Sequence, residues 1–510
     1  MSEVKKLAGQ TMWYGMSSVA AKLLNSLMTP LLTYFLVNDA QQIQYGSIAI
    51  IYSYFALLNV IFTYGMETGY FRFCSLEKGK KENIYNTAFA SLLVSTILFC
   101  IGLYIYRVPI ERFVVLDGHI EYINLAIIIL FFDTIQTIPF ARLRQEQKPR
   151  KYAFIRVLGI IINIVFVFFF LIIMPKLNAA YPDTFLAQLA LKYNIVTFVL
   201  FANVLQSVIT FLALFQEWKG FRFQFDRVLW KKMFRYSSPM VFIGLAGVVN
   251  EVIDRQMLIK LIDNTSDYAQ RIQAIYSANY KLSIVVTMFI TAFRMAAEPF
   301  FFSKADDKNA PILYAKITKW FVITVCIAYL TTALFLNDVW KLYIGQAYHS
   351  GLFIVPILLF ANVMNGIYYN LSTWYKITDR MWVGVIITLF GALITFIGNY
   401  LFIPKYEMLA GAWTTLAAYS SMVILSYFIG QKYYPIPYNV KRIGLYLAVM
   451  IGLYFIQNWI SGYFFQPSYV WLRLLTGFML FLSFILLIFV KEQKEMQSMP
   501  IIGKFLKQKK

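Results

Sequence analysis

Histidine and cysteine are nearly absent from this chain, which has 2 His and 3 Cys among its 510 residues. His119 and His349 lie in different loops without catalytic neighbours, and Cys74, Cys100 and Cys326 show neither pairing nor metal-ligand spacing. These absences exclude a disulfide framework and a zinc site. We therefore expect no metal site and no cofactor.

Motifs for catalysis are also missing, because the chain has no Gly-rich phosphate loop, no Cys-x-x-Cys and no His-x-x-x-His. The one adjacent acidic pair, Asp306-Asp307, lies in a short polar loop, and the longest segment between apolar runs is only Gln216 to Arg235. No soluble domain is present. An enzyme is not predicted; the enzymatic alternative is a membrane glycosyltransferase or polymerase.

Charge is scarce as well, at 14% of residues, whereas 60% are hydrophobic and the mean hydropathy is +0.62. A soluble domain of this length could not bury so much apolar surface. The composition predicts an all-α polytopic membrane protein.

Apolar runs of about 20 residues span a bilayer as helices, and fourteen such runs are predicted. They cover residues 8–36, 46–71, 84–106, 120–140, 152–174, 191–215, 236–262, 272–302, 313–336, 351–375, 382–402, 409–430, 442–461 and 469–490. The first run is long and lacks a small-residue cleavage site, so we expect it to be retained rather than removed as a signal peptide.

Lys and Arg gather in alternate loops and in the tail at 491–510, which predicts that both termini are cytoplasmic. The net charge of +21 is divided among these short loops. It therefore favours topology and contact with anionic membrane lipids, and no nucleic acid partner is expected.

Four polar or ionisable residues, Asn250, Glu251, Asp254 and Arg255, interrupt the run at 236–262. A charge at the centre of a membrane helix costs a few kcal/mol, so such residues normally face a protein interior or a water-filled path. They indicate a functional site.

A weak internal repeat relates the two halves of the chain. A shift of 231 residues places Tyr45 on Tyr276 and Glu67 on Glu298, and brings Lys22 to within one position of Asp254. Six spans separate the copies, so both halves keep one orientation. The expected organisation is a lobe at 1–215, a connecting loop at 216–235, a second lobe at 236–430, an extra helix pair at 442–490 and the tail at 491–510.

Several strings along the chain resemble the Wzx-like oligosaccharide and lipopolysaccharide (O-antigen) flippases of the multidrug/oligosaccharidyl-lipid/polysaccharide exporter superfamily. They are Tyr45-Gly46, Asp254-Arg255, the segment 275–282, Ala297-Glu298-Pro299, the segment 399–406 and Gly411-Ala412. Two positions depart from the family pattern: Glu407 stands where Gly is usual, and Trp413 where a small residue is usual. The local turn geometry is therefore in question.

The resemblance implies transport of a polyprenyl-pyrophosphate-linked oligosaccharide across the inner membrane by alternating access, for cell-surface polysaccharide assembly. A polysaccharide polymerase or assembly protein is an implied partner. Pyrophosphate needs cations away from bulk water and sugars need aromatic faces and hydrogen-bond partners. Lys22, Arg255 and Lys281 are the predicted cargo-binding cations, although Arg255 also has Glu251 and Asp254 as candidate partners.

The acidic residues within the spans have two candidate roles. They either carry a coupling ion, H+ or Na+, or form ion pairs that stabilise the structure. The residues concerned are Glu67, Asp133, Glu251 and Asp254, with Arg294 and Glu298 as a further i,i+4 pair. Glu67 has Arg72 as an alternative partner. A lipid-II flippase and a multidrug or cation antiporter of the same superfamily remain alternative functions.

Overall fold

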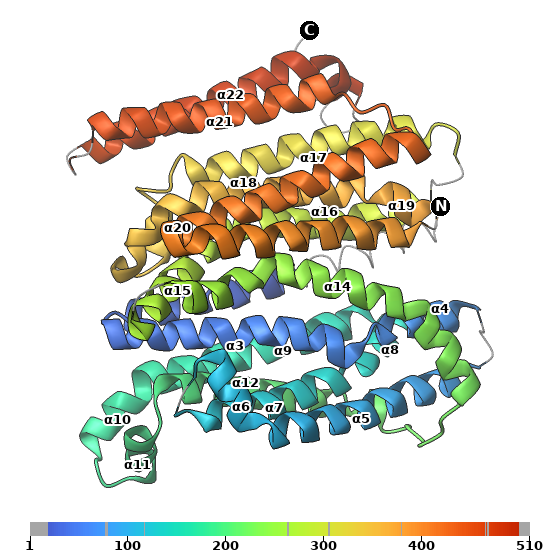
Figure 1. The fold of residues 1–510 in the computed structure, drawn as a ribbon, viewed down its shortest axis with the longest axis vertical. Coiled ribbons are helices and arrows are strands. Elements are labelled where there is room, and N and C mark those ends of the chain that lie inside the picture. Colours follow the sequence, from blue (N-terminus) through green and yellow to red (C-terminus); the bar gives the residue numbers. More distant parts are fainter. Residues whose placement is uncertain are drawn as a thin grey trace.

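The computed structural model describes residues 19–76, 80–116, 118–262, 265–303, 307–378, 380–464, 466 and 469–498, and within these ranges it is helical with no strand. Figure 1 shows long helices lying side by side in two stacked lobes, with the pair α21 and α22 on top. Among its described parts, the protein is the all-helical membrane protein that the sequence predicts.

The N-terminal lobe begins with a helical segment at 19–26. Its helices are α2 (Met28–Phe35), α3 (Asp39–Thr63), α4 (Met66–Leu76), α5 (Lys81–Ile105), α6 (Arg107–Val114), α7 (Ile120–Ile135), α8 (Thr137–Gln145), α9 (Pro149–Phe168) with the π turn η2 (Phe169–Ile173), α10 (Met174–Ala180), α11 (Phe185–Lys192), α12 (Ile195–Ala213) and α13 (Phe215–Trp218). The short helices α4, α8, α10 and α11 lie at the two ends of the lobe (Figure 1).

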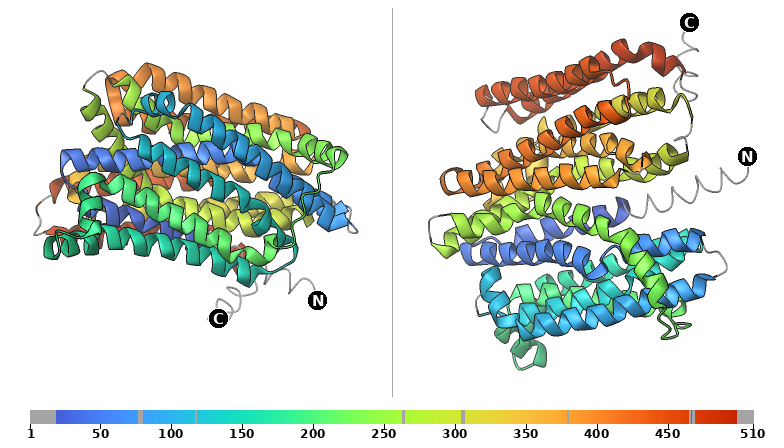
Figure 2. Two further views of the ribbon diagram at one scale, coloured as in Figure 1. Left: turned by 90° about the horizontal axis from the view of Figure 1, so that it is seen from below. Right: turned by 45° about the vertical axis from the view of Figure 1, so that its right-hand side comes forward.

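The C-terminal lobe begins with the long helix α14 (Arg227–Leu261). It continues with α15 (Ser266–Tyr280), the 3-10 turn η3 (Lys281–Ser283), α16 (Ile284–Ser303), α17 (Ala310–Ala333), η4 (Trp340–Tyr343), η5 (Gln346–Ile354), α18 (Val355–Leu371), α19 (Thr373–Ile377) and α20 (Met381–Tyr433). The final pair is α21 (Val440–Tyr463) and α22 (Val470–Ser498). Figure 2 shows that this pair lies beside the second lobe and away from the first.

Eleven helices of the described chain are long and apolar enough to cross a membrane. One of them, α20, contains two of the predicted spans joined at Glu407. The predicted span at 8–36 begins outside the described residues, and the span at 272–302 is broken by η3. These three features account for the difference between eleven helices and fourteen predicted spans.

The turn inside α20 contains Glu407, the residue that stands where the resembled family usually has Gly. Glu407 has φ 46° and ψ −124°, a conformation that favours glycine over a residue with a Cβ. Its carboxylate accepts a hydrogen bond from the Tyr268 hydroxyl at 3.0 Å. The turn inside α20 is therefore made by a strained residue whose carboxylate is held by the Tyr268 hydroxyl.

Two backbone breaks lie in contact where the lobes meet. Helix α3 ends at Tyr64 and Gly65, with φ values of 32° and 70°, and a Cβ on Gly65 would lie 2.9 Å from the carbonyl oxygen of Ser237. Ser237 precedes Pro239, the proline within α14. Because Leu229 and Met233 are buried with α4 and α5, the first turns of α14 pack on the N-terminal lobe, and the predicted loop at 216–235 contains this helix start.

Ion pairs at both ends attach α22 to the second lobe. The first group, which we call the inner clamp, joins Lys319 Nζ to Glu492 Oε2 at 2.5 Å and to Glu495 Oε1 at 2.6 Å; Arg442 and Tyr446 donate to the other oxygen of Glu492. The outer clamp joins Arg473 Nη2 to Asp338 Oδ1 at 2.6 Å. The side chains of Lys319, Glu492, Arg473 and Asp338 are all buried. The extra helix pair is therefore fixed to α17 and to the segment that follows it.

Candidate functional site

Five ionisable side chains from both lobes meet in the middle of the bundle: Lys22, Glu251, Arg255, Lys281 and Arg294. We call them the central cationic cluster. Lys22, on the segment 19–26, donates from Nζ to Thr291 Oγ1 of α16 at 2.6 Å and so connects the lobes. Glu251 and Arg294 are the charged groups that act on it. The cluster contains four cations and one acid.

Arg255 lies at the buried edge of this cluster, with 6% of its surface exposed. Its Nη1 donates to the main-chain oxygen of Glu251 at 3.0 Å, and its guanidinium lies 4.7 Å from the centre of the Tyr280 ring. The nearest described carboxylate oxygen is Asp254 Oδ1, at 4.0 Å. Arg255 is thus held by a main-chain hydrogen bond, an aromatic ring and a long ion pair with Asp254, one of its two predicted partners.

Asp254 has a different environment from its neighbours. It is 1% exposed, its Oδ1 accepts from the backbone N–H of Arg255 at 2.8 Å, and its Oδ2 accepts from the Tyr276 hydroxyl. Asn250 is equally buried and bonds α14 to α20 through the carbonyl of Thr388 and the hydroxyl of Thr395. Both residues join helices of the second lobe.

Glu251 and Lys281 keep solvent-exposed side chains although their helices lie inside the bundle. Glu251 acts electrostatically on Lys22, Lys281 and Tyr280, which places it centrally in the cluster. Lys281 occupies η3, where the helical path of α15 is interrupted before α16. The break brings its ammonium group near Arg255 and Lys22.

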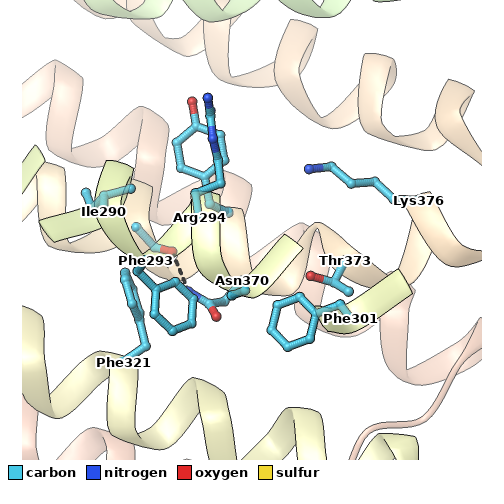
Figure 3. Close-up of a pocket in the computed structure, with 11 residues that line it drawn as sticks. Ile290, Phe293, Arg294, Phe301, Phe321, Asn370, Thr373 and Lys376 are labelled. Carbon is cyan, nitrogen blue, oxygen red and sulfur yellow. Dashed lines mark hydrogen bonds between the residues drawn. The ribbon is translucent and has the colours of Figure 1, made fainter. Parts of the chain in front are cut away.

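Arg294 extends the cluster along α16 into a pocket between α16, α18 and α19 (Figure 3). Its guanidinium lies 5.3 Å from the centre of the Tyr369 ring. Lys376 and Asn370 also line the pocket. The predicted partner Glu298 has a side chain outside the described part of the chain, so that pairing stays a prediction.

The acids of the first lobe lie away from the cluster. Glu67 forms an ion pair with Arg144 of α8 at 2.7 Å, in place of the alternative partner Arg72. Asp133 accepts hydrogen bonds from Gln136 at 2.8 Å and from Ser207 at 2.7 Å. Both acids line one cavity of about 430 Å³, which we call the N-lobe cavity.

The lobes are in close contact where α3 and α15 begin, at the end predicted to be extracytoplasmic. Asp39 and Arg271 form an ion pair at 2.6 Å, and the Tyr348 hydroxyl donates to the carbonyl of Leu36 at 2.7 Å. A Cβ on Gly46 would lie 2.7 Å from Gln273 Oε1 and 3.1 Å from the carbonyl oxygen of Gln270, so this close approach of α3 to α15 favours glycine. We call this the outer interlobe contact, and it joins the lobes at that end.

Sequence reasoning missed several residues that the structure brings to these sites. Tyr280 and Tyr369 support the two arginines of the cluster, and their spacing alone gave no signal. Lys319 did carry one, because it is a charge inside the predicted span at 313–336. Its partner Glu492 lies far along the chain, where only the folded structure connects the two.

Solved structures with the same fold are membrane transporters. The lipid II flippase MurJ in an inward closed conformation superposes with a TM-score of 0.70 at 14% identity, covering 94% of this chain and 99% of that chain. An inward-facing multidrug transporter of the MATE family, in the MOP superfamily, gives 0.63 at 13% identity over 86% and 99%. An outward-facing one gives 0.55 at 16% identity over 87% and 96%. The fold is therefore that of the MOP flippases and transporters.

The sequence identifies the family within that fold. The family described as "Polysaccharide biosynthesis protein" matches residues 7–304, more than half of the chain. No curated protein matches. The chain belongs to this polysaccharide biosynthesis family, as the sequence motifs indicate, and is a multi-pass membrane protein with a transporter fold.

Proposed function

We propose that this protein is a flippase that moves a polyprenyl-pyrophosphate-linked oligosaccharide from the inner to the outer leaflet by alternating access. It acts in a bacterial inner membrane with both termini in the cytoplasm. The observation that carries the proposal is the central cationic cluster, in which four cations share a single exposed acid, Glu251.

The charges of this cluster suit a pyrophosphate group. Cations held at membrane depth are costly unless a partner offsets them, and Lys22 has only the neutral hydroxyl of Thr291 as its described hydrogen-bond partner. Phosphate oxygens form charge-assisted hydrogen bonds with ammonium and guanidinium groups, which are stronger than neutral ones. A bound pyrophosphate would thus supply the negative charge that the cluster lacks.

The position of the cluster also suits alternating access. Lys22 belongs to the first lobe, whereas Arg255, Lys281 and Arg294 belong to the second. The lobes are joined near the cytoplasmic end by the start of α14 and at the other end by the outer interlobe contact. Relative movement of the lobes would then open that contact and carry the headgroup outward while the lipid tail stays in the bilayer.

Two related functions compete with this proposal. A lipid-II flippase shares the fold and a pyrophosphate cargo, so the glycan distinguishes the two. A multidrug or cation antiporter is less compatible, because four cations repel a cationic drug. Coupling to H+ or Na+ stays a proposal, with Glu251 and Asp133 as candidate carriers.

Reconstituted vesicles test the function directly. We expect vesicles carrying the protein to translocate polyprenyl-pyrophosphate-linked oligosaccharide without changing it covalently, and the Lys22→Ala variant to translocate it at least about tenfold more slowly, since a charge-assisted contact contributes about 1.5–3 kcal/mol. The control is Lys308→Ala, which removes an exposed cation outside the cluster.

Three outcomes would contradict the proposal. Full-rate translocation by Lys22→Ala would remove the cluster from the mechanism, and uptake of organic cations in place of lipid-linked sugars would favour the antiporter. A covalently altered lipid product would indicate an enzyme.

A further inference from the structure

We infer that the N-lobe cavity binds the sugar residues of the cargo, while the central cationic cluster holds its pyrophosphate. This assignment rests on the proposed function and names a second subsite for the same cargo. The cavity has a volume of about 430 Å³, which lies in the range of roughly 300–1,000 Å³ that is usual for small-molecule sites.

The lining of the cavity has the chemistry that recognises uncharged sugars. Sugar hydroxyls both donate and accept hydrogen bonds, and side-chain amides can do the same in one plane. The cavity offers four amides, three threonine hydroxyls and two aromatic rings: Asn25, Asn59, Gln136, Gln206, Thr63, Thr137, Thr210, Phe140 and Tyr152. An apolar drug would have few contacts among these groups.

Two hydrogen-bond acceptors in the cavity wall have no described donor. Asp133 Oδ1 already accepts from Gln136 and Ser207, and no described residue donates to its Oδ2. Gln136 is 7% exposed, and its Oε1 is buried without a described partner. An unpaired buried acceptor destabilises a protein because it has lost its hydrogen bonds to water without replacement. A ligand hydroxyl that donates to Gln136 Oε1 would supply the missing hydrogen bond, and Asp133 Oδ2 could accept a second one.

The cavity also offers a hydrogen-bond donor, the guanidinium of Arg156. The guanidinium of Arg156 lies 4.4 Å from the centre of the Phe140 ring and 5.8 Å from that of Tyr152. No described carboxylate lies within ion-pair distance of Arg156, so its N–H groups are available to a ligand in the cavity. The rings limit the positions that the guanidinium can adopt, which reduces the entropy lost on binding.

The charge balance separates this cavity from the cluster. Glu67 is paired with Arg144, and Asp133 faces the single cation Arg156, so the lining has no excess positive charge for a phosphate. The two sites are nevertheless adjacent, because Asn25 lines the cavity and lies three residues after Lys22, on the same helix face. A pyrophosphate at Lys22 would therefore direct its sugar toward the cavity.

The test compares two lipids that differ only in their glycan: the polyprenyl-pyrophosphate-linked oligosaccharide isolated from the host cell, and bare polyprenyl pyrophosphate. Asn59→Ala and Gln206→Ala suit it because no described residue is hydrogen-bonded to either side-chain amide. In reconstituted vesicles we expect each variant to lower the translocation of the glycan-bearing lipid about fivefold, the effect of one lost hydrogen bond. Translocation of the bare lipid should not change.

A matched control is Asn458→Ala, which removes the same amide from a different polar cavity, of about 250 Å³, between α17 and α21. It should translocate both lipids at the rate of the unaltered protein. Equal loss for both lipids in Asn59→Ala and Gln206→Ala, or no loss for either, would overturn the sugar subsite. A change confined to the dependence on a Na+ or proton gradient would also overturn it, by making the cavity an ion site. Under the proposed function, Lys22→Ala slows the translocation of both lipids. A failure of the proposed function would therefore appear in Lys22→Ala, whereas a failure of the sugar subsite would appear in Asn59→Ala and Gln206→Ala.

Discussion

The central cationic cluster and the inner clamp contain similar residues but differ in how their charges are satisfied. In the inner clamp, Lys319 contacts two carboxylates within 2.6 Å, and Glu492 also accepts from Arg442 and Tyr446. In the cluster, Lys22 donates to a hydroxyl, and the Arg255 guanidinium donates to a main-chain oxygen and lies 4.0 Å from its nearest carboxylate oxygen, on Asp254. Closely paired buried charges fix one helix against another, whereas cations without a close acid remain available to a ligand.

The largest expected effect comes from breaking the inner clamp. Lys319→Met leaves Glu492, whose side chain is fully buried, without its closest cation, and breaking a buried pair in this way costs about 3–5 kcal/mol. Thermal unfolding in detergent should show a correspondingly lower midpoint.

The control for this prediction is Lys316→Met. Lys316 lies 3.9 Å from Glu495 and is 43% exposed, so its pair should contribute under about 1 kcal/mol. Equal stability of the two variants would show that the inner clamp does not fix α22.

A smaller effect, of a different kind, is expected in the cluster. Lys281→Ala removes an exposed cation, so the unfolding midpoint should hardly move. Translocation should fall by about 10- to 100-fold, since a charge-assisted hydrogen bond to the cargo contributes about 1.5–3 kcal/mol.

This variant tests the comparison directly when stability and translocation are measured on the same preparation. A large loss of stability with unchanged translocation per folded molecule would assign Lys281 a structural role like that of Lys319.

Glu407 lies in neither the central cationic cluster nor the inner clamp. Substituting it tests whether a partly buried acid outside these groups stabilises the fold. Glu407→Gly removes a strained conformation that costs about 1–3 kcal/mol and loses one hydrogen bond from Tyr268. We expect a net stabilisation of about 1 kcal/mol, measured by thermal unfolding. Glu407→Gln keeps the strain and a hydrogen-bond acceptor and should match the unaltered protein; destabilisation by Glu407→Gly would mean that the Tyr268 contact outweighs the strain.

The smallest effect concerns Asp226, a half-buried acid that caps the start of α14. The backbone N–H of Leu229 bonds its carboxylate at 2.9 Å and lowers the pKa of Asp226. The contribution of the cap is therefore complete above the unfolded pKa of about 3.9 and is lost as the pH falls through the lower folded value.

The measurement is the difference in unfolding midpoint between the unaltered protein and Asp226→Ala at several pH values. That difference should be largest near neutral pH and should shrink on acidification below pH 4. A difference that grew on acidification would contradict the direction of the shift.

Much of the architecture was predictable because a bilayer imposes length and polarity on every span. The runs at 84–106 and 442–461 correspond closely to α5 and α21. The break at η3 was not predictable, since the apolar run continues through Lys281. The start of α14 at Arg227 was missed because its basic residues suggested a loop, whereas Leu229 and Met233 bury one face on the first lobe.

The candidate site was only partly predictable. Lys22 and Arg255 stood out because charges in apolar runs are costly, and the structure places both in the cluster. The same reasoning selected Asp254, which the structure instead bonds to Tyr276 inside the second lobe. Sequence position cannot show which face of a helix meets a neighbour and which faces a cavity.

The sequence by itself determined the membrane class, the approximate spans, the family and the presence of ionisable residues at membrane depth, because each of these follows from local composition and order. Tertiary structure decided which charges are paired. Lys319 and Glu492 lie at distant positions along the chain yet share one hydrogen bond, whereas Arg255 and Glu251 lie one helical turn apart and form no side-chain ion pair. The physical reason is that desolvation and pairing depend on what packs around a charge in three dimensions.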